Sequence, residues 1–335
     1  MAGRRTNLGL LALLLAALAT GTAAYATGTP AAARVVVVAH AVVGLALLIM
    51  SPAKSVIVRR GLRRPRAGKA DSIAFGVLIL LTVATGVAHA AGWVAVGGLR
   101  LLLVHVGAAL LAIPLGVRHV STRPVAPRRT DWSRRTLLKA GGVVGGGGLV
   151  VVATEGIVTA GGLPGAQRRQ TGSHEAGTGH PEQMPVTQWI ADAVPSIDPT
   201  DYRLRLAVAG AATTFTLAQL RRPGDRVTAT LDCTGGWFAV QEWAGTRLDR
   251  LVGDTGGARS VVVRSATGYT RRFPLRDLPH LLLATDVAGS PLSAGHGAPL
   301  RLVAPGRRGF WWVKWVTDVT IDDRPWWLQP PFPLQ

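Results

Sequence analysis

Cysteine is almost absent from the sequence: Cys233 is the only one in 335 residues. A single cysteine excludes an intramolecular disulfide, although domains outside the cytoplasm usually use cysteines in pairs. Cys233 is therefore interpreted as a reactive thiol or a metal ligand, with a buried small apolar side chain as the alternative. Residues 226–231 alternate as a strand and residues 242–252 have helical spacing, so the cysteine is expected on a loop at a strand end.

Acidic residues are also scarce, above all in the first half. Residues 1–164 contain three acidic and 18 basic residues, a net charge of +15, whereas residues 165–335 have a net charge of +4. The basic residues of the first half flank apolar runs, a pattern typical of membrane proteins. The total charge of +19 is therefore interpreted as a membrane signature, and nucleic acid is not an expected partner.

Five long apolar runs occupy the first half. Each is close to the roughly 20 residues that cross a hydrocarbon core of about 30 Å. The runs are Leu8–Ala26, Val35–Ile57, Ile73–Gly92, Leu99–Val117 and Ala140–Ala160. The first resembles a cleaved signal peptide, but three further runs follow it at close spacing, which favours a retained helix. The expected architecture is an α-helical membrane domain of four helices plus a fifth, tethering helix.

Basic residues are distributed unevenly between the two ends of these runs. Sixteen lie before the first run, between the second and third, and between the fourth and fifth, against two at the opposite ends, Arg34 and Arg100. The sixteen are Arg4, Arg5, Lys54, Arg59, Arg60, Arg63, Arg64, Arg66, Lys69, Arg118, Arg123, Arg128, Arg129, Arg134, Arg135 and Lys139. The positive-inside rule then predicts a multi-pass protein of the cell membrane, with a cytoplasmic N-terminus and an extracytoplasmic domain after the fifth helix.

A short motif precedes the fifth run. Ser133–Lys139 (Ser-Arg-Arg-Thr-Leu-Leu-Lys) resembles a twin-arginine export signal, with an ordinary basic flank as the alternative. The expected divisions are a four-helix membrane domain (1–120), a basic loop with the fifth helix (121–162), a linker (163–190) and a second domain (191–335). His174 and His180 fall in this linker, where we expect them to be solvated.

Three histidines lie within the apolar runs, where polar side chains are costly and usually functional. His40, His89 and His105 all fall near the ends predicted to face outward. A pair of neutral imidazoles from facing helices would hold a b-type haem, an arrangement that resembles the four-helix membrane cytochromes b. The alternative is that these histidines hydrogen-bond between helices or line a water-filled cavity.

The second half is rich in short strands and predicts an α+β fold with a mixed sheet. The expected strands are Tyr202–Val208, Arg226–Leu231, Arg259–Ser265, Tyr269–Phe273, Pro299–Val303 and Val313–Ile321. The expected helices are Thr216–Leu220, Arg247–Val252 and Leu275–Leu283. The tryptophans near the end of the chain are expected to pack in the core, with the membrane interface as the alternative for the last two: Trp311, Trp312, Trp315, Trp326 and Trp327.

Two motifs in this half resemble the sulfite oxidase superfamily of molybdopterin-dependent oxidoreductases. They are Leu231–Trp237 (Leu-Asp-Cys-Thr-Gly-Gly-Trp), followed by Glu-Trp-Ala-Gly-Thr-Arg-Leu from 242, and the run 293–316 that contains Gly-Phe-Trp-Trp-Val-Lys-Trp. The resemblance covers roughly Asp192 to Ile321 and implies that Cys233 is the thiolate ligand of molybdenum. It further implies pterin contacts from residues of the two motifs, namely Thr234, His296, Arg301, Arg307, Gly309 and Lys314.

The resemblance also implies a function. We expect oxygen-atom transfer, by sulfite-like oxidation or sulfoxide-like reduction of a small molecule, with electrons passing through the helices to or from a quinone or another carrier. An oxyanion substrate would need arginines, for which Arg264, Arg271 and Arg272 are candidates. Animal sulfite oxidases have a soluble haem domain and an immunoglobulin-like dimerisation domain that this sequence does not contain. The competing interpretation is a cofactor-free extracytoplasmic binding module on a passive anchor.

Overall fold

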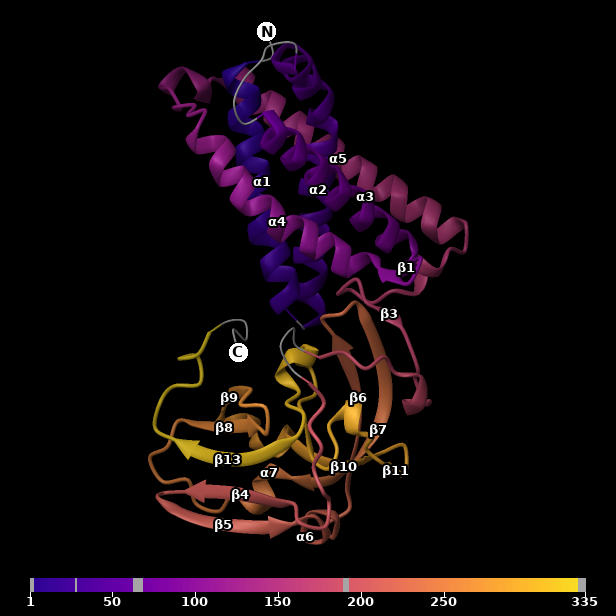
Figure 1. Cartoon of the computed structure of the whole chain (residues 1–335), viewed down its shortest axis with the longest axis vertical. Helices are drawn as coiled ribbons and strands as arrows, with labels where there is room; N and C mark the ends of the chain where they lie inside the picture. Colours follow the sequence, from indigo (N-terminus) through magenta and orange to yellow (C-terminus); the bar gives the residue numbers. More distant parts are fainter. Residues whose placement is uncertain (1–2, 28, 63–68, 189–192, 331–335) are drawn as a thin grey trace. The chain divides into compact units, whose positions relative to one another are not determined.

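A computed structural model describes residues 3–27, 29–62, 69–188 and 193–330. The chain divides into two compact units, Met1–His174 and Glu175–Gln335, which are described separately below (Figure 1). The division falls inside the predicted linker 163–190. Arg63, Arg64 and Arg66 of the predicted basic loop, and Asp192 at the start of the family resemblance, lie outside the described residues.

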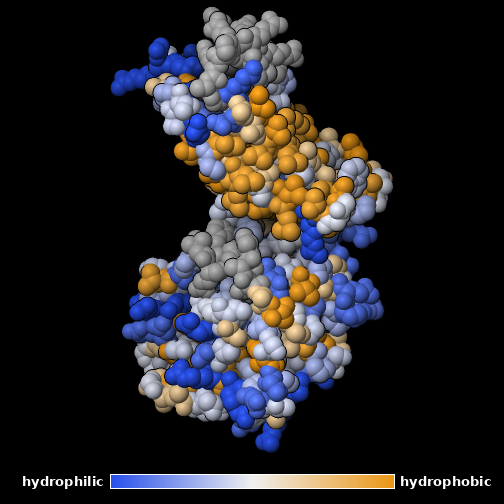
Figure 2. All heavy atoms as spheres, in the orientation of Figure 1, coloured by the Kyte–Doolittle hydropathy of each residue, from blue (hydrophilic) through white to orange (hydrophobic). Residues whose placement is uncertain are grey.

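Unit 1 consists of long helices joined by short connections. They are α1 (Arg4–Ala26), α2 (Pro30–Leu62), α3 (Lys69–Ala91), α4 (Leu101–Ser121) and α5 (Arg134–Ala160). The short strands β1 (Ala95–Val96) and β2 (Leu99–Arg100) pair before α4, and the 3₁₀ helices η1 (Arg129–Trp132) and η2 (Pro164–Gln167) flank α5. Within the described residues, all five α-helices are long and apolar enough to cross a membrane. Their outward surface is apolar in Figure 2, as expected for side chains that face lipid.

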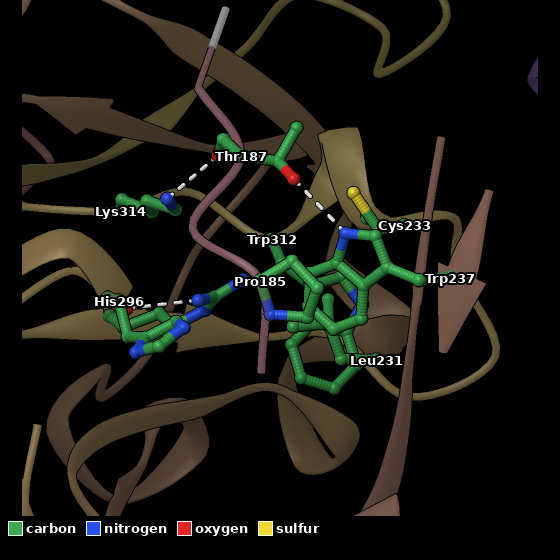
Figure 3. A pocket seen from close by; sticks show the side chains of 10 residues that line it. Pro185, Thr187, Leu231, Cys233, Trp237, His296, Trp312 and Lys314 are labelled. Atoms are coloured by element: carbon green, nitrogen blue, oxygen red, sulfur yellow. Dashed lines mark hydrogen bonds between the residues drawn. The ribbon is translucent and has the colours of Figure 1, made fainter. Parts of the chain in front are cut away.

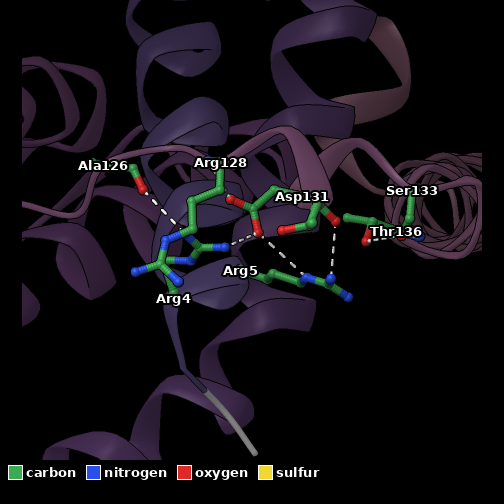
Figure 4. Close-up of polar contacts among 8 residues, drawn as sticks. Arg4, Arg5, Ala126, Arg128, Asp131, Ser133 and Thr136 are labelled. Carbon is green, nitrogen blue, oxygen red and sulfur yellow. Dashed lines mark hydrogen bonds and ion pairs between the residues drawn. The ribbon is translucent and has the colours of Figure 1, made fainter.

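An ionic cluster joins the start of α1 to the loop before α5. Asp131 is buried and accepts hydrogen bonds from Arg4 (2.6 Å), Arg5 (3.4 Å) and the backbone N–H of Arg128 (2.8 Å; Figure 4). The Arg128 N–H, followed by the charge of Arg4, lowers the pKa of the Asp131 carboxyl. One carboxylate thus connects the two arginines at the start of α1 to the loop before α5.

Unit 2 contains two sheets and short helices. The first sheet has the order β11-β10-β7-β3, with β12 beside β10 and β6 beside β7; the second has the order β5-β4-β13-β8-β9. The strands of the first sheet are β3 (His174–Glu175), β6 (Asp225–Cys233), β7 (Trp237–Arg247), β10 (Leu282–Val287), β11 (Ser290–Pro291) and β12 (Arg301–Val303). Those of the second are β4 (Arg203–Val208), β5 (Ala211–Thr216), β8 (Ser260–Ser265), β9 (Thr270–Pro274) and β13 (Val316–Asp322). The remaining elements are α6 (Leu217–Arg221), α7 (Leu248–Leu251), η3 (Pro181–Gln183), η4 (Leu275–His280), η5 (Ala294–His296) and η6 (Gly309–Trp311).

The second sheet is mixed, as the sequence predicts. β13 runs parallel to β4 and antiparallel to β8. The core between the sheets is built from large side chains with almost no exposed surface, including Trp243, Phe273 and Leu283. Trp312 and Trp315 are also buried, which confirms the predicted packing of these two tryptophans, whereas Trp327 is 63% exposed and does not pack in the core.

Two helix predictions are wrong. Residues 242–247 continue strand β7, in which every second residue from Trp237 to Gly245 is buried, and only the four residues of α7 are helical. Residues 275–283 form η4 and then the start of β10, because Leu282 and Leu283 pair with Arg247 and Thr246. In both places partners distant in the sequence outweigh the local helical spacing.

We predict that Gly245→Ala destabilises unit 2. A Cβ atom at Gly245 would lie 2.0 Å from the carbonyl oxygen of Leu283, where β7 pairs with β10. The expected loss in free energy of unfolding is about 1–3 kcal/mol, measured by denaturant unfolding of the full-length protein in detergent. Gly253→Ala is the control, because a Cβ atom there meets no atom within 4 Å; equal stability of the two variants would contradict the prediction.

Candidate functional site

The β6–β7 hairpin places Cys233 at the end of a strand, as predicted. Cys233 is the last residue of β6 and pairs with Trp237, the first residue of β7. Gly236 closes the turn: it has φ +83° and its N–H donates to the Cys233 carbonyl (3.1 Å). The Cys233 thiol is 9% exposed and accepts a hydrogen bond from the Gly235 N–H at 3.4 Å.

A buried ion pair fixes the backbone on both sides of the cysteine. The Arg308 guanidinium donates to the Asp232 carboxylate at 2.5 Å, and the two side chains are 4% and 7% exposed. Arg308 also donates to the Cys233 carbonyl at 3.5 Å. A Cβ atom at Gly309 would lie 3.0 Å from Cys233 Cα, so the backbone after Arg308 packs directly on the cysteine. Asp232 and Arg308 are not among the predicted site residues, because no local pattern links two positions so far apart in the sequence.

The thiol opens into a pocket (Figure 3). Its lining comes from both predicted motifs and from the segment before the domain: Pro185, Thr187, Leu231, Cys233, Trp237, His296, Arg301, Gly309, Trp312 and Lys314. The cavity is small, about 50 Å³. Thr187 lies over it, accepting from the Trp237 indole N–H (3.0 Å) through its hydroxyl and from Lys314 Nζ (2.8 Å) through its carbonyl. A ligand much larger than a few atoms therefore requires this segment to move.

Two cations lie in the pocket wall. Lys314 Nζ donates to the carbonyls of Thr187 (2.8 Å) and Gly295 (2.6 Å). Arg301 is 2% exposed and lies beside the rings of Trp243 and Trp312, with its guanidinium carbon 5.5 and 5.7 Å from their centroids. Burial lowers the pKa of Arg301 to about 10, so the guanidinium stays charged at neutral pH.

His296 is a neutral polar group beside these cations. Its Nδ1 lies 2.8 Å from the Ser293 hydroxyl, whereas its Nε2 is buried and makes no well-formed hydrogen bond in the described part of the chain. The backbone carbonyls of Met184 and Pro185 also interact with the ring. Burial, followed by the charges of Arg301 and Lys314, lowers the pKa of His296 to about 4. A thiol, a buried imidazole nitrogen and two cations form a donor set that suits a soft metal centre with an attached anionic group.

The other predicted residues lie outside this lining. Thr234 is in the hairpin turn, and Arg307 pairs with Asp277 (2.6 Å) while its guanidinium stacks on Trp311. The three arginines suggested for the substrate do not line the pocket. Arg264 is exposed, Arg271 is buried over the Trp311 ring, and Arg272 pairs with Asp322 at 2.7 Å. Their strand β9 and its neighbour β8 belong to the second sheet, whereas the cysteine hairpin belongs to the first.

In unit 1 the predicted histidines separate into two groups. The rings of His40 and His105 lie 5.9 Å apart, whereas His89 packs against His174 with ring centroids 4.8 Å apart. The prediction that His174 is solvated is wrong. His174 is 7% exposed, because its Nε2 hydrogen-bonds the His89 carbonyl at 2.9 Å.

A family model for the oxidoreductase molybdopterin-binding domain matches residues 191–327. Residues 191–327 carry a molybdopterin-binding domain. The domain is that of an enzyme of the oxidoreductase class, and its match spans both motifs that contribute Cys233, His296, Arg301, Gly309 and Lys314 to one pocket.

Known proteins resemble part of the chain. Mitochondrial sulfite oxidase of Rattus norvegicus is 29% identical over 166 residues, and that of Homo sapiens is 28% identical. In both cases the match covers 38% of this chain and 30% of the relative. The chain thus matches less than a third of the length of these relatives. A solved structure, the sulfane dehydrogenase SoxCD of Paracoccus pantotrophus, is 27% identical, covers 39% of this chain and 40% of its own, and has a TM-score of 0.37.

We predict that Asp232→Asn strongly destabilises the molybdopterin-binding domain. The substitution leaves the buried Arg308 cation without its charged partner, which costs about 3–5 kcal/mol in comparable buried pairs. The matched control is Glu242→Gln, because Glu242 pairs with Arg226 on the surface (side chains 44% and 64% exposed) and such a pair contributes about 0–1 kcal/mol. Denaturant unfolding followed by tryptophan fluorescence measures both; similar losses would show that the ion pair does not stabilise this loop.

Proposed function

We propose that the protein is a membrane-anchored molybdopterin-dependent oxidoreductase with an extracytoplasmic catalytic domain. The observation that carries the proposal is the only thiol of the chain, at the end of β6, facing a pocket with two buried or half-buried cations and a buried imidazole nitrogen. The matched family model and the sulfite oxidase relatives support the same reaction class.

Each pocket residue has a role in this proposal. Cys233 would bind molybdenum as a thiolate, Lys314 and Arg301 would bind the phosphate of the pterin, and His296 would offer its Nε2 to the same cofactor. Gly309 lets its loop pack directly on the Cys233 backbone, because a Cβ atom there would lie 3.0 Å from Cys233 Cα. When bound, the molybdenum cofactor supplies oxygen-atom transfer coupled to two electrons.

The net reaction balances in either direction. In the oxidative direction a substrate of the sulfite class gains an oxygen atom from water and releases two electrons and two protons. In the reductive direction a sulfoxide-like substrate consumes two electrons and two protons, and its oxygen atom leaves as water. A b-type haem held by the helical unit would supply electron transfer to or from a quinone or another membrane carrier.

We predict that Cys233→Ser abolishes molybdenum binding and turnover. Serine removes the soft ligand, so bound molybdenum and activity with sulfite or a sulfoxide should fall at least about 100-fold. Metal analysis by mass spectrometry tests binding independently of the substrate. Arg264→Gln is the control, because Arg264 is exposed and outside the pocket. Folded wild-type protein without molybdenum, made in a host that synthesises the cofactor, would instead support a binding module.

The orientation predicts a labelling pattern for single cysteines in a Cys233→Ser background. Val96→Cys, in the connection between α3 and α4, and Thr213→Cys, on β5, should react in intact cells with a maleimide that cannot cross membranes. Thr122→Cys, after α4, should react only after lysis. All three positions are exposed, so burial does not confound the result. The reverse pattern would place the catalytic domain in the cytoplasm.

A further inference from the structure

The first four helices contain an internal repeat. Ala19-Thr20-Gly21 in α1 matches Ala84-Thr85-Gly86 in α3. In both copies a histidine follows the glycine by 19 residues, His40 in α2 and His105 in α4. α1 packs along α2, and α3 packs along α4. Each copy is therefore a helical hairpin that carries the Ala-Thr-Gly motif on its first helix and the histidine on its second.

The two copies share their internal hydrogen bonds. The Thr20 hydroxyl donates to the carbonyls of Ala16 (2.7 Å) and Ala17 (3.2 Å). The Thr85 hydroxyl donates to the carbonyls at the equivalent positions, Leu81 (2.7 Å) and Thr82 (3.1 Å). The repeat is therefore structural as well as sequential.

Each histidine lies on the glycine of its own hairpin. A Cβ atom at Gly21 would lie 3.0 Å from His40 Cε1, and a Cβ atom at Gly86 would lie 3.0 Å from His105 Cε1. Contacts this close leave almost no room for a larger residue. The glycines thus position the two imidazole rings.

The hydrogen bonds also set the tautomer of both rings. His105 Nδ1 lies 2.7 Å from the Thr82 carbonyl, which only accepts, so this nitrogen carries a proton. His40 Nδ1 lies 3.1 Å from the Thr20 hydroxyl, whose own proton is donated to the helix carbonyls. The neutral rings therefore keep an Nε2 lone pair each, the state in which histidine binds metals.

The two copies bring these rings together. Their centroids are 5.9 Å apart with planes at 86°. Since metal–imidazole bonds are about 2.0–2.1 Å, two imidazoles on opposite sides of one metal have centres about 6.4 Å apart. Within the described residues no group of three or more His, Cys, Asp or Glu side chains could hold an ion. A site with two donors suits an iron whose other four positions are filled by a porphyrin.

We propose that the duplicated hairpins form one bis-histidine site, with His40 and His105 as the two axial ligands of a b-type haem. Thr20, Gly21, Thr82 and Gly86 act as positioning residues. The proposal deepens the electron-transfer part of the proposed function, yet the site itself uses no residue of the molybdopterin-binding domain.

His89 does not belong to this site. Its counterpart in the first hairpin is Ala24, so it lies outside the repeat. Its Nε2 lies 3.2 Å from the Gly172 carbonyl, and its ring packs on His174. His89 is therefore the matched control for the two ligands.

The test is the haem content and spin state of full-length protein purified in detergent from a haem-competent host. Wild-type protein should contain about one haem per chain in a low-spin ferric form, and its EPR signal should be highly anisotropic because the imidazole planes are nearly perpendicular. His40→Gly and His105→Gly should each reduce low-spin haem at least about tenfold. Free imidazole should restore the low-spin signal in both, and His89→Ala should leave it unchanged.

Several results would overturn the proposal. Wild-type protein without haem would do so, as would low-spin haem that survives in His40→Gly or His105→Gly or is lost in His89→Ala. Rescue by imidazole separates ligand loss from misfolding, because a misfolded protein does not recover the signal. Cys233→Ser should keep its haem, so failure of the molybdenum proposal and failure of this one give different results.

Discussion

The buried contact between Asp232 and Arg308 is the constraint on which the pocket at Cys233 depends. It joins the end of β6 to residues 76 positions further along the chain, and it places Gly309 against the Cys233 backbone. η6 follows directly and leads to Trp312, which lines the pocket and stacks near Arg301. A buried ion pair is tolerated in the folded state only when both partners are present, because either charge alone is costly to bury. The cysteine is therefore held by an interaction that is stable only in the assembled fold.

Among the described residues, the pocket lining places positive charge around one thiol and includes no carboxylate. Burial and the neighbouring cations keep His296 neutral, so the positive charge resides on Arg301 and Lys314. Both cations satisfy backbone carbonyls in the present arrangement, Arg301 that of His296 and Lys314 those of Gly295 and Thr187. An anionic ligand would compete with these neutral acceptors and would gain the stronger, charge-assisted hydrogen bonds. The same exchange would release Thr187 from Lys314, which connects ligand entry with movement of the segment over the cavity.

Sequence patterns predicted the elements whose signal is local and missed those that depend on distant partners. The strand before Cys233 has clear alternation, and the cysteine lies at its end as expected. Residues 242–247 have apolar spacing compatible with a helix, but the pairing of β7 with β6 on one side and β10 on the other makes them a strand. Five of the seven residues suggested for the molybdenum cofactor line one pocket, because the family motifs identify them. The Asp232–Arg308 pair and the burial of His174 arise from tertiary contacts that no local pattern encodes.

In the proposed haem site, the repeat of the helical hairpin explains how two histidines, His40 and His105, can bind one iron together. Each ring obtains its orientation from its own copy, through the carbonyl or hydroxyl at Nδ1 and the glycine beneath it. A duplicated unit that packs against itself tends to bring equivalent groups together. Pairing the two hairpins therefore supplies the Nε2 lone pairs of His40 and His105 without any further residue. The two copies differ in sequence at positions that do not contribute to the two-histidine site. His89 stands where the first copy has Ala24, and its hydrogen bond to Gly172 serves the packing of the chain after α5 instead.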